Sequence, residues 1–267
     1  MTGNRYMLNG AMVPEAAYVV SGEDAGLLRG RAVFETLRTF NGQLFRGPQH
    51  VRRLLGSAEA LGIDTPGEAA LLGELHMAVN GYSAPAKVNI VLTGGGERLV
   101  RVGPLDRSRQ GAPIRVATRT WEPPPWLDGR SKHCSRALNE AAVRHAGVDE
   151  VFWLGRDGSI TEATRSNVFA VVDGELLTPP DDGRILAGVT RSALMEAASD
   201  IDLSVREALL RPDTAFEELY ASSTLKDLAP VVELDGRVLT GLGPVGARLQ
   251  AAFAALVARE CPPANGP

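Results

Sequence analysis

The stretch GVDEVFWLGRDGSITEATRSNVFAV, residues 147–171, is the most specific part of the sequence. Apolar residues dominate at 150–154 and again at 167–172, which predicts two strands, and the Arg-Asp-Gly sequence at 156–158 is typical of a turn. Glu162 stands in the same stretch, where a further turn leads into the later strand. By itself Glu162 has a plain interpretation as a turn carboxylate, so its meaning depends on the rest of the chain.

Patterns on both sides of this stretch predict a mixed α and β protein. Asn9-Gly10 and Asn41-Gly42 lie between alternating apolar residues, as in β-hairpins. The remaining apolar patterns predict strands at 86–93 and 114–120 and helices at 48–61, 67–80, 138–145, 188–199 and 244–259.

Residues 103–113, GPLDRSRQGAP, divide the chain into two predicted domains. This segment is polar, contains two prolines and has no apolar period, as is typical of a linker. We therefore expect an N-terminal α/β domain over 1–107 and a C-terminal α/β domain over 108–267. A chain of 267 residues is long enough for two domains of this size.

The composition excludes several classes of protein. The chain is 44% hydrophobic and 22% charged with a net charge of −4, and it has neither a basic face for nucleic acid nor a polybasic segment for a membrane. The first ten residues lack the basic start and apolar core of a signal peptide, and no apolar run approaches the length of a membrane span. We expect a cytoplasmic protein in reducing surroundings.

No metal site and no common catalytic motif is visible in the sequence. Cys134 and Cys261 lie far apart, and the four histidines show no ligand spacing, so no metal is expected. The motifs G-x-S-x-G, H-E-x-x-H and the Walker loop are missing. The sequence TGGG at 93–96 follows a strand without opening a clear helix, which favours a glycine-rich turn over a nucleotide-binding loop.

Lysine is rare in this chain, which draws attention to Lys132. The three lysines, at positions 87, 132 and 226, stand against 25 arginines. Arginine stays protonated in proteins, whereas lysine can lose its proton and act as an amine nucleophile. Lys132 lies in SKHCSRAL, residues 131–138, ahead of a predicted helix.

Four further positions, taken together with Lys132, offer the groups that one cofactor requires. Arg53 lies on a helix, residues 189–190 begin a helix after a glycine, and residues 223–224 end a strand. Each has an ordinary explanation, such as a solvated charge or a helix cap. Together with Glu162 they supply an amine, a carboxylate for a pyridine nitrogen, and a phosphate cradle at a helix N-terminus, which pyridoxal phosphate requires.

From Asp24 to Val231 the chain resembles the class IV, fold-type IV pyridoxal phosphate enzymes. That family includes branched-chain and D-amino acid aminotransferases and aminodeoxychorismate lyase. The segments that carry the resemblance are RGRAVFETLR, HVRRL, SKHCSR, the stretch at 147–171, ILAGVTR and SSTLKDLAPV. The resemblance implies two mixed α and β domains with the site between them, a cofactor-binding C-terminal domain, pyridoxal 5′-phosphate as the cofactor, a small-molecule substrate and a homodimer.

The resemblance also implies a role for each residue of the set. It makes Lys132 the Schiff-base lysine and Glu162 the carboxylate at the pyridine nitrogen. It places Phe34 or its loop at the edge of the substrate pocket. The other cofactor contacts that it implies are Arg53, Asn167, Val189, Thr190, Ser223 and Thr224.

Within the family, several features favour aminodeoxychorismate lyase, which forms 4-aminobenzoate and pyruvate in folate biosynthesis. KHCSR resembles the K-H-x-x-R arrangement of these lyases, and Ala137 stands where branched-chain aminotransferases usually carry a tyrosine. LTGGG lacks the strand arginine common in transaminases. Arg136 and Lys226 are two cations that would suit a dicarboxylate substrate.

Two other functions stay open at this point. An aminotransferase acting on a branched-chain amino acid, a D-amino acid or an (R)-amine is the close alternative, since the segment from Lys132 to Gly147 is about one helical turn shorter than in relatives. A noncatalytic protein that binds pyridoxal phosphate is the distant alternative. The joint presence of Lys132, Glu162 and Arg53 argues against it.

Overall fold

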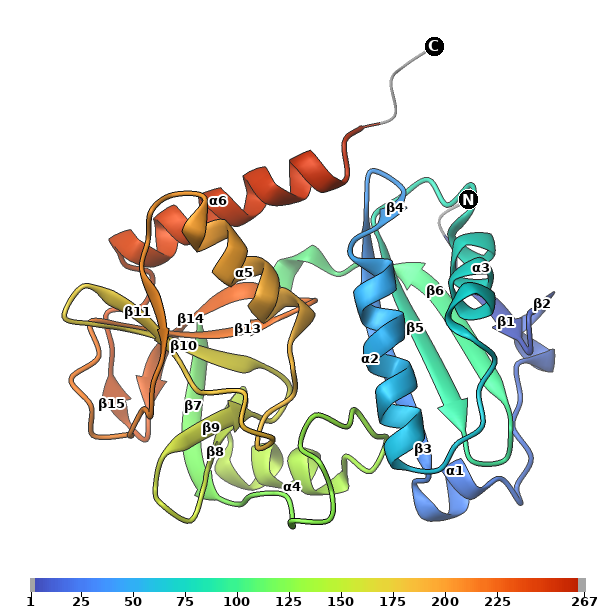
Figure 1. The fold of residues 1–267 in the computed structure, drawn as a ribbon, viewed down its shortest axis with the longest axis horizontal. Coiled ribbons are helices and arrows are strands. Elements are labelled where there is room, and N and C mark those ends of the chain that lie inside the picture. Colours follow the sequence, from blue (N-terminus) through green and yellow to red (C-terminus); the bar gives the residue numbers. More distant parts are fainter. Residues whose placement is uncertain (1–2, 264–267) are drawn as a thin grey trace. The chain divides into compact units, whose positions relative to one another are not determined.

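The chain folds into two compact units in a computed structural model that describes residues 3–263 (Figure 1). The first unit comprises residues 3–106, 131–135 and 257–263, and the second comprises 107–130 and 136–256. Each unit contains a sheet with helices packed on it, so the predicted mixed α and β fold is confirmed. Lys132 follows the predicted linker in sequence, yet its short segment belongs to the first unit.

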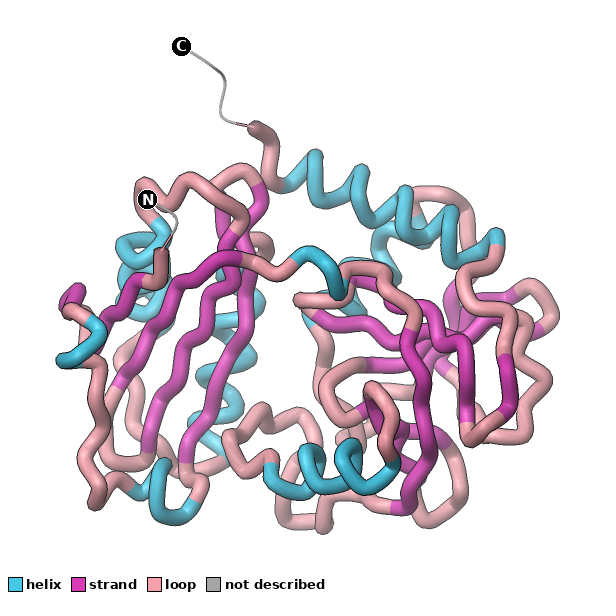
Figure 2. The backbone as a smooth tube through the Cα atoms, turned by 180° about the vertical axis from the view of Figure 1, so that it is seen from behind, coloured by secondary structure: helices cyan, strands magenta, loops and turns pink. Residues whose placement is uncertain are grey.

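An antiparallel six-stranded sheet with the order β2-β1-β6-β5-β3-β4 forms the first unit. Helices α2 and α3 bury their apolar stripes, including Leu54 and Leu75, in the core that they share with the sheet. Figure 1 shows both helices on one face of this sheet, and Figure 2 shows the strands from the other side. The elements are β1 (Arg5–Leu8), β2 (Ala11–Val13), η1 (Glu15–Ala17), α1 (Ala25–Arg29), β3 (Ala32–Phe40), β4 (Gln43–Leu44), α2 (Gly47–Ala60), α3 (Glu68–Val79), β5 (Ala86–Thr93) and β6 (Arg98–Pro104).

Both predicted Asn-Gly turns are confirmed in the first unit. Asn9 and Gly10 have φ values of 51° and 84°, and Asn41 and Gly42 have φ values of 50° and 78°. Two consecutive positive φ angles are required by the tight turn that matches strand twist, and Asn-Gly adopts them with little strain. The sequence therefore specified these hairpins locally.

Strand β6 was not predicted, and its last residues fall in the segment interpreted as a linker. Pro104 still pairs with Ala86 across the sheet. A proline at the end of a strand is tolerated because its missing N–H is not needed by a further ladder bond. The linker is therefore shorter at its start than the sequence predicted.

A nine-stranded sheet forms the second unit, with the order β12-β11-β10-β13-β14-β7-β8-β9 and β15 paired with β14. Its core includes Val168, Ala170 and Leu219, and α5 buries Ala193 and Leu194. The elements are η2 (Arg107–Arg109), β7 (Ile114–Thr120), α4 (Ala137–Ala146), β8 (Glu150–Leu154), β9 (Ile160–Ala163), β10 (Asn167–Val172), β11 (Glu175–Thr178), α5 (Val189–Ser199), β12 (Val205–Glu207), β13 (Glu218–Ser223), β14 (Asp227–Leu234), β15 (Arg237–Val238) and α6 (Pro244–Glu260).

The placement of Glu162 in a turn was wrong, because this residue lies on β9. The strand pairs with β8, with Phe152 opposite Ala163 and Leu154 opposite Ile160. The turn comes after the strand, at residues 164–166. Polar residues on a short edge strand hide the alternation that would reveal it in sequence.

The part of the chain that the structure describes contains no helix long and apolar enough to cross a membrane.

The N-terminus of α6 is held by a buried carboxylate from β13. Glu218 accepts hydrogen bonds from the N–H groups of Val245 at 3.0 Å and Gly246 at 2.7 Å, and from the hydroxyl of Tyr220. A Cβ on Gly246 would lie 1.9 Å from the Tyr220 hydroxyl oxygen, so glycine is required at this close approach. Glu218 thereby satisfies helix N–H groups that no residue of α6 itself could reach.

We predict that Glu218→Ala lowers the free energy of unfolding by about 3 kcal/mol or more, because it leaves a buried hydroxyl and two helix N–H groups without an acceptor. Urea denaturation of the two proteins measures the difference. Glu217→Ala is the matched control, since Glu217 is exposed and accepts one hydrogen bond, from the Gly174 N–H at 3.1 Å. Equal losses in the two variants would contradict the assignment.

Candidate active site

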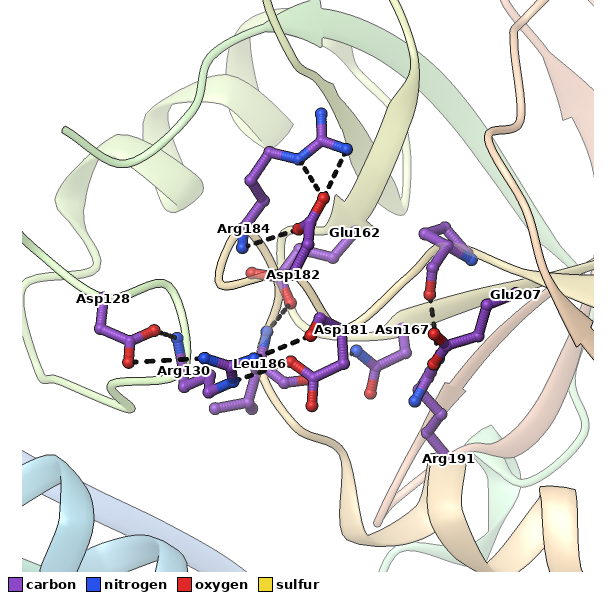
Figure 3. Close-up of polar contacts among 11 residues, drawn as sticks. Asp128, Arg130, Glu162, Asn167, Asp181, Asp182, Arg184, Leu186, Arg191 and Glu207 are labelled. Atoms are coloured by element: carbon purple, nitrogen blue, oxygen red, sulfur yellow. Dashed lines mark hydrogen bonds and ion pairs between the residues drawn. The ribbon is translucent and has the colours of Figure 1, made fainter. Parts of the chain in front are cut away.

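Glu162 and Asn167 hold the backbone of one residue, Leu186, from both sides (Figure 3). The Leu186 N–H donates to Oε2 of Glu162 at 3.0 Å, and the Leu186 carbonyl accepts from Nδ2 of Asn167 at 2.9 Å. Glu162 comes from β9 and Asn167 begins β10, so the turn between these strands sets the spacing of the two side chains. They fix the segment that leads into α5.

The N-terminus of α5 lies directly after this clamp. Gly188 is the residue before the helix and makes no side-chain cap, while Val189 and Thr190 form the first turn and are 7% exposed. A Cβ at position 188 would lie 1.9 Å from Oδ1 of Asn167, so only glycine fits there. A helix N-terminus without a side-chain cap is suited to bind an anion such as phosphate.

Arg191 anchors the same helix start to its surroundings. Its guanidinium donates to the carbonyl of Pro179 at 2.9 Å and to the Thr178 hydroxyl at 3.2 Å, and it forms an ion pair with Glu207 at 2.7 Å. The side chain is buried, and buried arginine is stable only when it is paired in this way. Sequence reasoning missed Arg191, although its place in ILAGVTR was a signal.

Two further arginines restrain the loop between β11 and α5. Arg184 pairs with Asp182 at 2.8 Å, and Arg130 pairs with Asp181 at 2.9 Å. Hydrogen bonds from Ser159, with Arg184 beside them, lower the pKa of Asp157 to about 2. Figure 3 shows the arginines and aspartates around the loop that carries Leu186. Ion pairs therefore restrain the loop that leads into the N-terminus of α5.

The end of β13 lies beside Asn167 in the sheet. Asn167 pairs with Ser222 across β10 and β13, and Ser223 and Thr224 follow at the end of β13. The Ser222 hydroxyl is buried and has no hydrogen-bond partner among residues 3–263. The structure thus brings together six of the predicted residues in the second unit: Glu162, Asn167, Val189, Thr190, Ser223 and Thr224.

Lys132 is held in the first unit by backbone contacts to β3 and α2. Its carbonyl accepts from the Phe34 N–H at 3.0 Å, and its N–H donates to the Ser57 hydroxyl at 3.0 Å. Its ammonium nitrogen lies 4.9 Å from the centre of the Phe34 ring, which is cation–π distance. Phe34 was predicted at the site edge, whereas the contact from Ser57 on α2 had no signal in the sequence.

Arg53 forms a buried ion pair that the sequence did not predict. Its Nε and one terminal nitrogen lie 2.6 and 2.9 Å from the two carboxylate oxygens of Glu35, and Nδ1 of His50 lies 2.8 Å from the same group. Burial alone would raise the pKa of Glu35, but Arg53 and His50 outweigh it and hold the pKa well below its usual value. Burial lowers the pKa of His50, and Glu35 offsets part of that shift. The phosphate role of Arg53 stays a prediction.

Arg136 and Lys226, the two cations predicted for substrate, both have partners within the second unit. Arg136 precedes α4 and donates to the carbonyl of Thr164. Lys226 forms an ion pair with the fully buried Glu150 and lies 3.3 Å from the Ser166 hydroxyl. Burial and then Arg109 lower the pKa of Lys226 to about 8, whereas the direct pair with Glu150 favours the ammonium form. The direct contact holds Lys226 as the charged partner of Glu150.

Comparison with known proteins identifies the family. Residues 32–234 match the family model described as amino-transferase class IV. A putative branched-chain-amino-acid aminotransferase of Methanocaldococcus jannaschii is 31% identical over 92% of this chain and 94% of its own length. A D-alanine aminotransferase of Staphylococcus aureus is 27% identical over 93% of this chain and 96% of its own length.

Solved structures are similar over almost the whole chain. A fold IV transaminase of Curtobacterium pusillum has a TM-score of 0.86 with 27% identity, covering 96% of this chain and 98% of that one. A hypothetical aminotransferase of Mycobacterium tuberculosis, in a form with α-ketoglutarate and PMP bound, has a TM-score of 0.87 with 25% identity, covering 96% and 99%. The chain belongs to the class IV aminotransferase family and is a pyridoxal phosphate-dependent enzyme.

The residues of the second unit fit this cofactor. Asn167 leaves no room for a Cβ at position 188, so the backbone at the start of α5 stays open to a phosphate. The buried Ser222 hydroxyl beside Asn167 still lacks a hydrogen-bond partner among the described residues. Glu162 supplies a carboxylate next to both features.

We predict that Arg53→Ala lowers the free energy of unfolding at pH 7 by about 3–5 kcal/mol, because it leaves Glu35 buried without its main counter-charge. The penalty should shrink as the pH falls toward 5. In the wild type the depressed pKa keeps Glu35 ionised at both pH values, whereas in the variant burial raises the folded pKa above the unfolded value of about 4.3. Protonation then relieves the cost in the folded variant.

Urea denaturation of the wild type and Arg53→Ala at pH 7 and pH 5 measures how far the difference in unfolding free energy decreases. Arg52→Ala is the control, since Arg52 is 57% exposed and pairs with Glu68 at 3.2 Å. It should cost less than about 1 kcal/mol at either pH. A penalty for Arg53→Ala that is the same at both pH values would show that Glu35 is not the uncompensated charge.

Proposed function

We propose that this enzyme is an aminotransferase that moves an amino group between an α-amino acid and a 2-oxo acid. The observation that carries the proposal is the cluster of Glu162, Asn167 and the open N-terminus of α5, joined through Leu186. It offers one carboxylate for a pyridine nitrogen and one anion site for a phosphate. The M. jannaschii and S. aureus relatives named as aminotransferases support this reaction.

Each residue of the cluster has a defined task in this proposal. When bound, pyridoxal phosphate supplies an aldehyde carbon for an amine and a ring that accepts electrons as a proton leaves the substrate. Glu162 holds a proton at the ring nitrogen, and its bond from the Leu186 N–H keeps the carboxylate oriented. Val189, Thr190, Ser223 and Thr224 bind the phosphate through backbone and hydroxyl groups.

Lys132 attaches the cofactor and then moves the proton in this proposal. An amine released from the cofactor can take a proton from the substrate carbon and return it elsewhere. The N–H of Lys132 donates to Ser57 and its carbonyl accepts from Phe34, so the backbone on both sides of its Cα is fixed and its side chain starts from a defined position.

Elimination from aminodeoxychorismate is the second candidate. Its support in the sequence was the KHCSR pattern and two cations for a dicarboxylate. Those cations, Arg136 and Lys226, bind Thr164 and Glu150, so using them for substrate would break contacts inside the second unit. We therefore place transamination first.

We predict that borohydride reduction attaches the cofactor to Lys132. Of the three lysines, Lys132 has its backbone fixed on both sides, whereas Lys226 pairs with Glu150. Peptide mass mapping after reduction locates the adduct, and Lys132→Ala should abolish it. An adduct on Lys226 or Lys87 would refute the assignment.

Half-reaction spectroscopy tests the reaction itself. Purified holoenzyme is mixed with one L- or D-amino acid at a time. The absorption band of the lysine-bound aldehyde form of the cofactor should decrease, and the band of the pyridoxamine form should increase. The same preparation supplied with aminodeoxychorismate should release no 4-aminobenzoate. Release of 4-aminobenzoate without pyridoxamine formation would make the enzyme the lyase.

We also propose the homodimer that the family resemblance implies. Two-fold dimers are the commonest assembly of soluble enzymes. Light scattering should return twice the 28.3 kDa mass of the chain.

A further inference from the structure

Arg31 occupies the space that a side chain at position 94 would need. A Cβ on Gly94 would lie 2.3 Å from Nε of Arg31 and 2.9 Å from its carbonyl oxygen. The Arg31 guanidinium donates to the Gly94 carbonyl at 2.7 Å, and the Gly94 N–H donates to the Arg31 carbonyl at 2.7 Å. The glycine turn that follows β5 therefore leaves space for the Arg31 side chain and binds it.

Asp24, a carboxylate beside this turn, forms its hydrogen bonds with groups other than Arg31. Asp24 accepts from the Thr93 hydroxyl at 2.7 Å and from the Gly26 N–H at 2.6 Å, and it lies where a Cβ of Gly95 would be. Arg31 itself is exposed and has no acidic partner within residues 3–263. One guanidinium nitrogen is bound to Gly94, and the other N–H groups remain available for a ligand.

Arg31 lies next to the segment that carries Lys132. It immediately precedes β3, whose first residues bond to that segment: the Cys134 N–H donates to the Ala32 carbonyl at 2.8 Å, and the Phe34 N–H donates to the Lys132 carbonyl at 3.0 Å. Three cations that the sequence predicted for the site are bound to protein groups: Arg53 to Glu35, Arg136 to the Thr164 carbonyl and Lys226 to Glu150. Arg31 thus has guanidinium N–H groups that can bind a ligand, a side chain that is held by Gly94, and a position beside the segment of Lys132.

We propose that Arg31 binds the carboxylate of the amino acid and 2-oxo acid substrates, an inference that rests on the proposed function. A guanidinium can donate two parallel hydrogen bonds to a carboxylate. The bond to the Gly94 carbonyl limits the rotation of the Arg31 side chain before substrate arrives, which reduces the entropy lost on binding. The turn LTGGG contains no arginine, and Arg31, the residue before β3, supplies the carboxylate-binding cation beside it.

The test compares substrates with and without a carboxylate. The wild type and Arg31→Gln are assayed in the half-reaction with the amino acid that the wild type converts fastest, and with the amine in which hydrogen replaces that carboxylate. Arg31→Gln should reduce kcat/KM for the amino acid by about 10- to 100-fold, the effect of losing a charge-assisted hydrogen bond, and leave the amine within about twofold. Arg31→Lys should recover part of the loss.

Arg29→Gln is the matched control, because Arg29 is also an exposed arginine, at the last position of α1. Arg29→Gln should leave kcat/KM unchanged for both substrates. Calorimetric titration with succinate, a dicarboxylate that carries no amine, provides a readout apart from turnover: Arg31→Gln should weaken its binding and Arg29→Gln should not. This titration decides the question if the wild type does not accept the amine.

Equal losses on both substrates, or unchanged succinate affinity in Arg31→Gln, would overturn the role of Arg31 while leaving the aminotransferase intact. A wild-type holoenzyme that forms no pyridoxamine from any amino acid would overturn the proposed function, and the role of Arg31 with it.

Discussion

The two hydrogen bonds on Leu186 are the constraint on which the second unit's site depends. The backbone N–H of Leu186 binds Glu162 and its carbonyl binds Asn167, at 3.0 and 2.9 Å. Three things follow from this one residue. The carboxylate of Glu162 is oriented, the start of α5 is fixed three residues later, and Gly188 is required because Asn167 fills the space of its Cβ. Substituting Asn167 would therefore disturb the carboxylate and the helix N-terminus together.

Buried charge pairs support the sites of both units. Glu35 binds Arg53 in the first unit, and Lys226 binds Glu150 in the second. Such pairs add little net stability, because desolvation offsets most of their attraction, but breaking one leaves a costly lone charge. Their effect is to allow few alternative side-chain arrangements near the predicted cofactor contacts.

These pairs also bear on which reaction the enzyme favours. A cation that is paired with a buried carboxylate is a poor substrate ligand, since the protein would lose that contact for each substrate bound. Lys226 is in this position, whereas Arg31 donates one hydrogen bond to the Gly94 carbonyl and keeps its other N–H groups for a ligand. The proposed role of Arg31, beside the predicted cofactor lysine, suits a substrate with one carboxylate, as α-amino acids and 2-oxo acids have.

The family and the fold class could be predicted from the sequence alone, and Lys132 stays its prediction for the cofactor lysine. Local signals were sufficient for the Asn-Gly hairpins and the helix at Gly47–Ala60, because turn dihedrals and apolar spacing depend on neighbouring residues. Which charged side chains can bind a ligand depends on the tertiary structure. Glu35 and Arg53 are 18 residues apart, and Arg31 and Gly94 are 63 apart, so no local pattern could pair them. Burial and long-range contact set the roles of these residues, and both arise only when distant strands and helices pack.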